Sequence, residues 1–410
     1  MSNIISLNEI KVGLHFGDEI IPVGRLAIRG YNIYFEYHDT FIDLKLNISP
    51  VKLPLETGLQ TFNPSLFEGL SGVFNDSLPD GWGRLLLDRF LRSKNVLPSE
   101  FSPLDRLAHV GLSGLGALIY EPDHSEDKSN DELNLDALAN QIQEVIDGEA
   151  DDVLHELIAL NGSSAGARPK ALIGVGYDRK HIIHGKQELP ESYEHWIVKF
   201  ANSTDGVDAG AIEFVYSLMA KEAGLEMTES HLLPASKGAG FFATKRFDRD
   251  DNKKLHMHTA SGLLHSDFRT PSLDYEDLLA LTEVLTKDVR EVEKMFRLSV
   301  FNILSHNRDD HGKNFSFLMD SFGQWKLAPA YDLTFSSGPH GHQSTMVMGE
   351  GQNPSIEHLI KLGMETNLNC SQIDEIIEQA RHALDKWETL SENYGVSKAN
   401  IKLIKSRLMV

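Results

Sequence analysis

The architecture of this chain is most clearly indicated by His306-Asn-Arg-Asp-Asp-His-Gly-Lys-Asn314, followed downstream by Ala328-Pro-Ala-Tyr-Asp-Leu333. Asp309 lies five residues before Asn314, and Asp332 follows 18 residues after Asn314 in an apolar setting. Carboxylate and carboxamide oxygens are the ligands that Mg²⁺ prefers. The order of these side chains therefore indicates a site for a metal-bound phosphate group.

Protein kinases hold a catalytic base and two magnesium ions around ATP with acids and an amide in this order. In this interpretation Asp309 accepts or orients the proton of a substrate hydroxyl, while Asn314 and Asp332 ligate Mg²⁺. Asp310 is not the expected base, because only Asp309 has the five-residue offset to Asn314. The alternative is a capped turn between two helices, rich in Asp and Asn for local hydrogen bonding. The predicted nucleotide contacts of this region are His311, Lys313, Asn314 and Asp332.

A loop of small residues, Asn161-Gly-Ser-Ser-Ala-Gly-Ala-Arg-Pro-Lys170, runs into an apolar strand upstream. Small residues let backbone N–H groups come close to phosphate oxygens. We therefore predict that Ser164, Ala165 and Gly166 contact ATP. The loop is neither a Walker loop nor the G-x-G-x-x-G loop of kinases, and taken alone it is better explained as a flexible surface loop.

A lysine and a glutamate follow this loop at kinase-like positions. Lys199 ends the apolar run Trp196-Ile-Val-Lys, where a buried ammonium group needs an anionic partner. In kinases a strand lysine contacts the α- and β-phosphates and pairs with a helix glutamate. Glu213, on the next expected helix, is the candidate for that ion pair. The alternatives are a strand-end lysine that reaches solvent and an exposed helix carboxylate.

The segment Thr244-Lys-Arg-Phe-Asp248 ends a further strand and has the position of a hinge. There the backbone of Lys245 and Phe247 would lie beside adenine, and Asp248 would contact ribose. An ordinary strand end is the alternative. The small-residue loop, strand lysine, helix glutamate, hinge, acid-amide pair and late acid together follow kinase order over about 170 residues.

Composition limits the classes of partner. The net charge is −21, so the surface repels nucleic acid and anionic membranes, and we expect contact with DNA only through a basic partner. The sequence has no apolar run long enough to cross a bilayer and no signal-peptide pattern. The single cysteine, Cys370, excludes an intramolecular disulfide and is typical of a reducing cytoplasm.

Periodicity predicts an α+β chain. We expect strands at 10–16, 34–37, 42–48, 171–175, 195–200 and 240–247, and helices at 79–90, 133–146, 211–223, 275–285, 289–304 and 373–384. Asp80 is the expected N-cap of the first helix. The predicted domains are residues 1–125, an N-terminal subdomain; 126–270, an α/β lobe with the small-residue loop and hinge; and 271–410, a helical lobe. An α/β part and a helical part fit a bilobal enzyme with its site in the cleft between them.

At this point the chain resembles a known family, the HipA serine/threonine kinases. The resemblance covers nearly the whole length. It rests on five stretches: Phe74-Asn-Asp-Ser-Leu-Pro-Asp-Gly81, Ser163-Ser-Ala-Gly-Ala-Arg-Pro-Lys170, Phe242-Ala-Thr-Lys-Arg-Phe-Asp-Arg249, Asp309-Asp-His-Gly-Lys-Asn314 and Leu327-Ala-Pro-Ala-Tyr-Asp332. Two details differ from relatives, the second acid Asp310 and the pair Arg168-Pro169, and both leave the substrate open.

The resemblance implies a kinase-like fold with an all-helical C-terminal lobe and an ATP- and Mg²⁺-dependent toxin of a toxin–antitoxin module. Its substrate would be a protein linked to translation, such as an aminoacyl-tRNA synthetase. A helix-turn-helix antitoxin dimer, HipB-like, would bind the kinase and repress the operon with it. Autophosphorylation in the small-residue loop would fall on Ser163, with Ser164 as the alternative.

Two other functions remain open. The chain could be a co-repressor or binding module whose kinase site is vestigial, or a kinase for small molecules, since such kinases share the same catalytic order. Turnover of ATP with Mg²⁺ separates the first from an active kinase. The N-terminal unit of about 120 residues and the loop serine favour a protein substrate.

Overall fold

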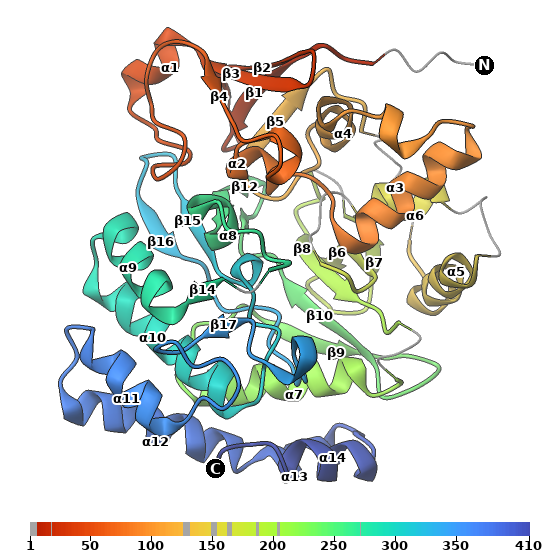
Figure 1. The fold of residues 1–410 in the computed structure, drawn as a ribbon. Helices are drawn as coiled ribbons and strands as arrows, with labels where there is room; N and C mark the ends of the chain where they lie inside the picture. Colours follow the sequence, from red (N-terminus) through yellow and green to blue (C-terminus); the bar gives the residue numbers. More distant parts are fainter. Residues whose placement is uncertain are drawn as a thin grey trace.

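The computed structural model describes residues 6–17, 19–125, 132–148, 154–161, 166–185, 188–202, 206–270 and 272–410. These residues form an N-terminal unit, a central sheet and a C-terminal lobe. Figure 1 shows the N-terminal unit at the top and the last helices along the bottom. The α+β, bilobal architecture predicted from the sequence is confirmed.

The N-terminal unit is built on an antiparallel sheet with the strand order β4-β3-β2-β1-β5. Apolar residues on one face of these strands, such as Ile10 and Val12, are buried in a core with the adjoining helices. The strands are β1 (Glu9–His15), β2 (Ile20–Arg29), β3 (Asn32–Tyr37), β4 (Gln60–Thr61) and β5 (Leu118–Glu121). The helices are α1 (Asp39–Leu44), α2 (Gly72–Asn75), α3 (Gly81–Ser93) and α4 (Pro103–Val110).

One predicted strand of this unit is wrong. Residues 42–48 begin within helix α1, which ends where Lys45 takes a left-handed φ of 57°. Of the alternating apolar residues, Leu46 and Ile48 are buried, but Leu44 is exposed. A short helix followed by a turn therefore gave the alternation of apolar residues that is typical of a strand.

The central sheet is also antiparallel and has the strand order β7-β6-β8-β10-β9. Its strands are β6 (Lys170–Gly176), β7 (Ile182–His184), β8 (Tyr193–Lys199), β9 (Ser230–Leu233) and β10 (Phe241–Lys245). Helices α5 (Leu135–Asp147) and α6 (Leu154–Asn161) pack on one face, against Ala171, Trp196 and Val198. Because strand side chains alternate between faces, Lys170 and Lys199 point to the opposite face.

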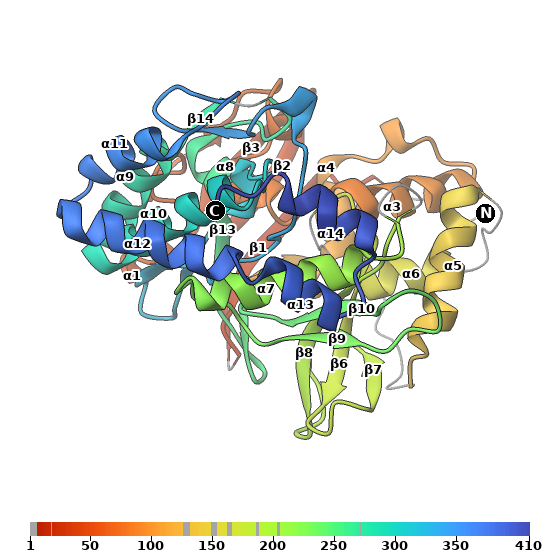
Figure 2. The same ribbon diagram turned by 90° about the horizontal axis from the view of Figure 1, so that it is seen from below.

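Helix α7 (Ala209–Glu222) joins the central sheet to the C-terminal lobe. It contacts β9 and β10, yet its buried residues Val215 and Tyr216 belong to the core of the helical lobe. Figure 2 shows α7 lying beside α12 and α13. The helices of the lobe are α8 (Ala260–Leu264), α9 (Tyr275–Thr286), α10 (Val289–Leu304), α11 (Ile356–Met364), α12 (Cys370–Leu384), α13 (Trp387–Asn393) and α14 (Lys398–Lys405).

The expectation of an all-helical C-terminal lobe needs one correction. Short strands lie among its helices, and they form a sheet with the order β13-β15-β16 and a pair β14-β17. Strands this short carry too few residues for a period-two pattern. Their bounds are β13 (His256–Thr259), β14 (Leu273–Asp274), β15 (Ser316–Met319), β16 (Trp325–Leu327) and β17 (Thr345–Met346), and the ribbon β11 (Arg249–Asp250) with β12 (Lys253–Lys254) precedes them.

The N-terminal unit is attached to the C-terminal lobe by a buried seam. Met319 of β15 is part of the N-terminal core. Asp76 accepts the Thr259 N–H at 2.8 Å and lies 2.6 Å from His258 Nδ1, while Ser49 Oγ lies 3.0 Å from the other ring nitrogen of His258. These contacts hold the N-terminal unit against β13 and β15. No helix in the described ranges is both long and apolar enough to span a bilayer.

Candidate active site

Three of the predicted site residues meet around one ammonium group. Lys199 Nζ, at the end of β8, donates to Glu213 Oε1 of α7 and to Asp332 Oδ1 after β16, both at 2.5 Å. Asp332 adopts a φ of 57°, a conformation that is uncommon outside glycine and frequent at functional sites. The two halves of the molecule are therefore joined by one ion network.

The charges in this network shift one another's ionisation. Burial opposes a charged Lys199, but Asp332 and Glu213 outweigh it and raise the lysine's pKa. Burial would raise the pKa of Asp332, yet Lys199 and Lys170 hold it well below its usual range. Burial raises the pKa of Glu213, and Lys199 offsets this only in part. The two carboxylates thus shift in opposite directions, and Asp332 is ionised at neutral pH.

Lys170 was not among the predicted site residues, although it belongs there. It pairs directly across the sheet with Lys199 and is only 6% exposed. Burial lowers the pKa of Lys170, and Lys199 adds to this while Asp332 opposes it. Like charges placed opposite each other on neighbouring strands are unfavourable, so the sheet concentrates positive charge on one face. The sequence signal was available, because Lys170 opens an apolar strand much as Lys199 closes one.

Arg168 adds another cation beside this pair. Its guanidinium lies 3.6 Å from Glu213 Oε2, and its side chain is partly exposed. Together with Lys170 and Lys199 it forms a cationic surface next to Asp332. Cations grouped in this way favour a polyanionic ligand.

The predicted base lies in the loop between α10 and the short 3-10 helix η3 (Gly312–Asn314). Asp309 is open to solvent. Surrounding protein still withdraws its carboxyl from water and raises its pKa; Asp332 acts in the same direction, whereas His311 and Arg168 oppose it. The Asn314 side-chain N–H group donates to the Asp309 carbonyl at 2.7 Å. Asp309, Asn314 and Asp332 are therefore brought into one neighbourhood.

Asp310 has a different role from Asp309. Its Oδ1 accepts the N–H groups of Ser344 and Thr345, both at 3.1 Å, and its Oδ2 accepts the Tyr275 hydroxyl at 2.6 Å. Burial raises the pKa of Asp310 to about 7. A carboxyl enclosed by these donors fixes the catalytic loop and cannot meet a substrate.

The other two predicted contacts of this loop, His311 and Lys313, both lie against Phe268, and Lys313 also reaches the N-terminal unit. His311 lies against Phe268 with ring centroids 5.3 Å apart. Lys313 Nζ lies 4.8 Å from the centre of the same ring and donates to Asp80 Oδ2 at 2.6 Å. Tyr331, next to Asp332, donates its hydroxyl to the Lys313 carbonyl at 2.5 Å. The catalytic and metal loops are thus tied to each other directly.

The side chains of the hinge residues contact neighbouring segments of the protein. One predicted nucleotide contact among them needs correction. Lys245 ends β10 and its Nζ donates to Glu194 at 2.6 Å, while Phe247 lies 5.2 Å from Tyr331 between ring centres. Asp248, which we predicted to contact ribose, is buried instead. Its oxygens accept from Arg246, Arg249 and the Gly116 N–H. A carboxylate with these partners holds the hinge to the N-terminal unit, so the ribose assignment is withdrawn.

Of the small-residue loop, Asn161 and the residues from Gly166 onward are described. Ser163, Ser164 and Ala165 lie outside the described residues. The Gly166 N–H donates to Asp80 Oδ1 at 2.5 Å, and its carbonyl accepts the Trp82 N–H at 3.1 Å. Asp80 was predicted only as a helix cap, and its part in the site came from no sequence signal.

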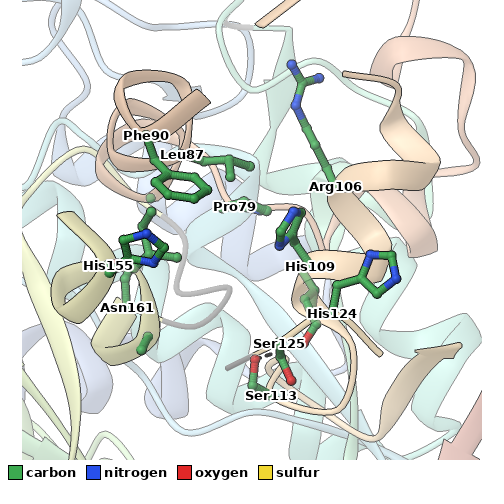
Figure 3. A pocket seen from close by; sticks show the side chains of 14 residues that line it. Pro79, Leu87, Phe90, Arg106, His109, Ser113, His124, Ser125, His155 and Asn161 are labelled. Carbon is green, nitrogen blue, oxygen red and sulfur yellow. Dashed lines mark hydrogen bonds between the residues drawn. The ribbon is translucent and has the colours of Figure 1, made fainter. Parts of the chain in front are cut away.

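A separate cavity lies behind this region, between α3, α4 and α6. Figure 3 shows Phe90 and His155 on one side and His109 and His124 on the other, with Asn161 at the end of α6. Its volume is about 90 Å³, whereas sites for drug-sized ligands usually occupy 300–1,000 Å³. The predicted nucleotide contacts do not line it, so this cavity is not the nucleotide site.

The donor set near Asp309 fits Mg²⁺. Lys199 binds Oδ1 of Asp332, so Oδ2 is the oxygen that a metal ion would take, together with the Asn314 carboxamide oxygen. Among the described residues, no three or more His, Cys, Asp or Glu side chains form a metal-ligand group. Magnesium commonly binds through one or two protein oxygens and completes its shell with water and phosphate. It would neutralise phosphate charge here.

Comparison with known proteins agrees with this geometry. Residues 162–387 match the HipA-like C-terminal domain, and residues 19–121 match the HipA N-terminal domain. The chain belongs to the HipA family. Both HipA domain models are therefore matched, and Lys199, Glu213, Asp309, Asn314 and Asp332 all fall within the C-terminal match.

Two HipA relatives show how far the similarity reaches. The serine/threonine-protein kinase toxin HipA of Shewanella oneidensis is 24% identical over 353 residues, which is 79% of this chain and 75% of the relative. A solved structure of HipA from the same organism, in complex with HipB and operator DNA, has a TM-score of 0.69 and 17% identity. It covers 97% of this chain and 96% of the solved one. The HipA fold is thus shared along nearly the whole length.

Proposed function

We propose that this chain is an ATP- and Mg²⁺-dependent serine/threonine protein kinase. The observation that carries the proposal is the bond of Lys199 to both Glu213 and Asp332, beside the opposed Lys170 and next to Asp309. In kinases a strand lysine pairs with a helix glutamate, and an aspartate of the metal-binding loop lies at the same site.

In the proposed reaction the hydroxyl oxygen of a substrate serine or threonine bonds to the γ-phosphorus of ATP. The bond between that phosphorus and the bridging oxygen breaks, and ADP leaves. Asp309 takes the hydroxyl proton, Lys199 contacts the α- and β-phosphates, and Lys170, Arg168 and Lys313 balance charge. Asn314 and Asp332 hold Mg²⁺, which offsets the phosphate charge.

We further propose a toxin role with a protein partner. The solved HipA relative was captured with HipB and operator DNA. A small, basic helix-turn-helix dimer of that kind would bridge this acidic chain to an operator and repress it. The proposed substrate is a protein of the translation machinery, in the class of aminoacyl-tRNA synthetases.

The proposed self-modification is on Ser163, with Ser164 as its alternative. A phosphoserine adds about two negative charges and would repel ATP from Lys170 and Lys199. Incubation with labelled ATP followed by phosphopeptide mapping tests this, and the peptide with residues 162–168 should carry the label. Label confined to other peptides contradicts the assignment.

The central test compares wild type with Asp309→Gln in labelled ATP, Mg²⁺ and cell lysate. Removing a general base lowers rates by roughly 10²–10⁴-fold, so we expect labelled protein bands only with wild type. The matched control is Asp374→Gln, an exposed acid on α12, which should label as wild type does. Undiminished labelling by folded Asp309→Gln protein, or label only in small molecules, would refute the proposal.

A further inference from the structure

Asp80 occupies the N-cap position of α3 but does not cap the helix with its side chain. An N-cap aspartate usually accepts an N–H from the first helical turn, which stabilises a helix by about 1 kcal/mol. Here the carboxylate reaches two distant segments instead. Oδ1 accepts the Gly166 N–H at 2.5 Å, and Oδ2 accepts Lys313 Nζ at 2.6 Å. One side chain therefore links the small-residue loop to the catalytic loop.

The Asp80–Lys313 pair is buried on both sides, with side chains 11% and 5% exposed. A lysine at this depth needs a counter-ion, and removing one member of a buried pair leaves the other charge uncompensated. Burial would raise the pKa of Asp80, but Lys313, the Gly166 N–H and Lys170 hold it below its usual range. The contact is thus an ion pair at neutral pH.

Residues 79–83 also restrict the position of Gly166, because they pack closely against its backbone. The Trp82 N–H donates to the Gly166 carbonyl at 3.1 Å. Gly81 has a φ of 45°, and a Cβ there would lie 2.5 Å from the Gly166 oxygen. A Cβ on Gly83 would lie 2.3 Å from Asn161 Nδ2, so the segment also packs closely against the end of α6. The start and end of the loop before Lys170 are both set by the N-terminal unit.

We propose that Asp80 is a positioning residue of the phosphoryl-transfer site: it holds Lys313 and Gly166 in register, so that transfer depends on the N-terminal unit. This inference rests on the proposed kinase function and names how that site is controlled. Any partner that moves residues 79–83 would change the catalytic loop and the phosphate-binding loop together.

The kinetic test uses Asp80→Asn, which removes the charge but keeps an oxygen that can accept the Gly166 N–H. We expect kcat to fall at least about tenfold while KM for ATP changes less than about threefold, because the contact orients Lys313 rather than the nucleotide as a whole. Lys313→Gln should give a similar loss. The double variant should equal Lys313→Gln within about twofold, because both changes remove one contact.

The matched control is Asp105→Asn, a buried acid of the same unit whose carboxylate accepts hydrogen bonds from Ser6, Leu7 and Ser102 within the described part of the N-terminal unit. Its kcat should equal that of wild type. Independent losses in the double variant, or a wild-type kcat in Asp80→Asn, would overturn the inference while leaving the kinase intact. Wild-type protein without transfer activity would instead overturn the proposed function, and this inference with it.

A second readout needs no nucleotide. In ATP-free protein, hydrogen exchange of residues 166–170 should be at least about fivefold faster in Asp80→Asn, with α12 unchanged. If that variant does not fold, Gly81→Ala serves, because its methyl group displaces Gly166 and leaves the Asp80 charge in place. Faster exchange with a lower kcat supports the inference, and unchanged exchange contradicts it.

Discussion

Asp309 and Asp310 are adjacent carboxylates in opposite surroundings. Asp309 is exposed beside Asp332 and Arg168, where a substrate hydroxyl can reach it. Asp310 points inward and accepts hydrogen bonds from Tyr275, Ser344 and Thr345. Of these two chemically identical side chains, only Asp309 is available for the proposed reaction, while Asp310 holds the loop in place.

The buried acid should make stability depend on pH. The pKa of Asp310 is raised to about 7 in the folded protein, against about 3.9 when unfolded. Between these values the folded state binds more protons, so stability falls as pH rises from about 4 to about 7. Asp310→Asn stays neutral at every pH, so its stability should lack this pH-dependent contribution. Urea unfolding measures this as the free energy of unfolding of the variant minus that of wild type. The difference should be larger at pH 8 than at pH 4.5, by roughly 2–4 kcal/mol.

The control for this prediction is Asp374→Asn, whose carboxylate is exposed on α12. The difference between this control and wild type should not change over the same pH range. A constant difference between Asp310→Asn and wild type would show that Asp310 is ionised throughout and that its hydrogen bonds offset its burial.

Residue order was enough to select the acids and the amide as candidates, and their catalytic and metal-binding roles stay predictions. Asp309, Asn314 and Asp332 occur at characteristic spacings, so no three-dimensional information was needed to select them. Asp80 could not be found that way, because its partners lie 86 and 233 residues away in sequence. Asp248 was misassigned for a different reason. Its neighbours Arg246 and Arg249 fold back onto it, and a linear pattern does not show which side chain is buried.

At the scale of elements, the antiparallel pairing of β6 and β8 creates the cationic face. Register places Lys170 opposite Lys199, and alternation turns both away from the apolar layer under α5 and α6. α7 then brings Glu213 to the same face. The sheet thus determines how far apart these charged side chains lie on the face of the site.

We predict that Lys170→Met weakens ATP binding without destabilising the folded protein. Because burial and Lys199 disfavour the Lys170 charge, the nucleotide-free variant should be at least as stable as wild type. ATP with Mg²⁺ should bind at least about tenfold more weakly, which removes about 1.4 kcal/mol of ligand-induced stabilisation. Thermal unfolding with and without Mg²⁺–ATP measures both effects.

Lys11→Met, on the exposed side of β1, is the matched lysine control and should respond to ATP as wild type does. A destabilised Lys170→Met variant with an unchanged ATP response would mean that this lysine stabilises the sheet and does not bind phosphate.

Elements were predicted well where their periodic patterns are long. α9, α10 and α12 lie close to the predicted ranges. β2 was missed because Pro22 and Gly24 interrupt its pattern. The pairing shifts register there, between Val12 and Gly13 of β1, and bulges of this kind accommodate such residues. The strand at 42–48 failed for the opposite reason, since a helix end and a turn produced a false alternation.

At the scale of the whole molecule, the N-terminal unit, the central sheet and the helical lobe meet at one place. The seam through Asp76 and His258 and the link through Asp80 hold the N-terminal unit against the catalytic loop. The whole chain carries a net charge of −21, while the side chains of Lys170 and Lys199 are largely buried at the site. This division of charge separates the proposed phosphate-binding site from an exterior that repels nucleic acid.

The last prediction follows from that exterior. The purified chain alone should bind duplex DNA with a Kd weaker than about 10⁻⁵ M at physiological salt, because an acidic protein releases few counterions from DNA. With a basic helix-turn-helix dimer the complex should bind operator DNA near 10⁻⁸ M or tighter. Its salt dependence should equal that of the dimer alone, since the dimer supplies the phosphate contacts. Fluorescence anisotropy at several salt concentrations measures both values. Submicromolar binding by the isolated chain would show a basic DNA-binding surface that the charge distribution does not predict.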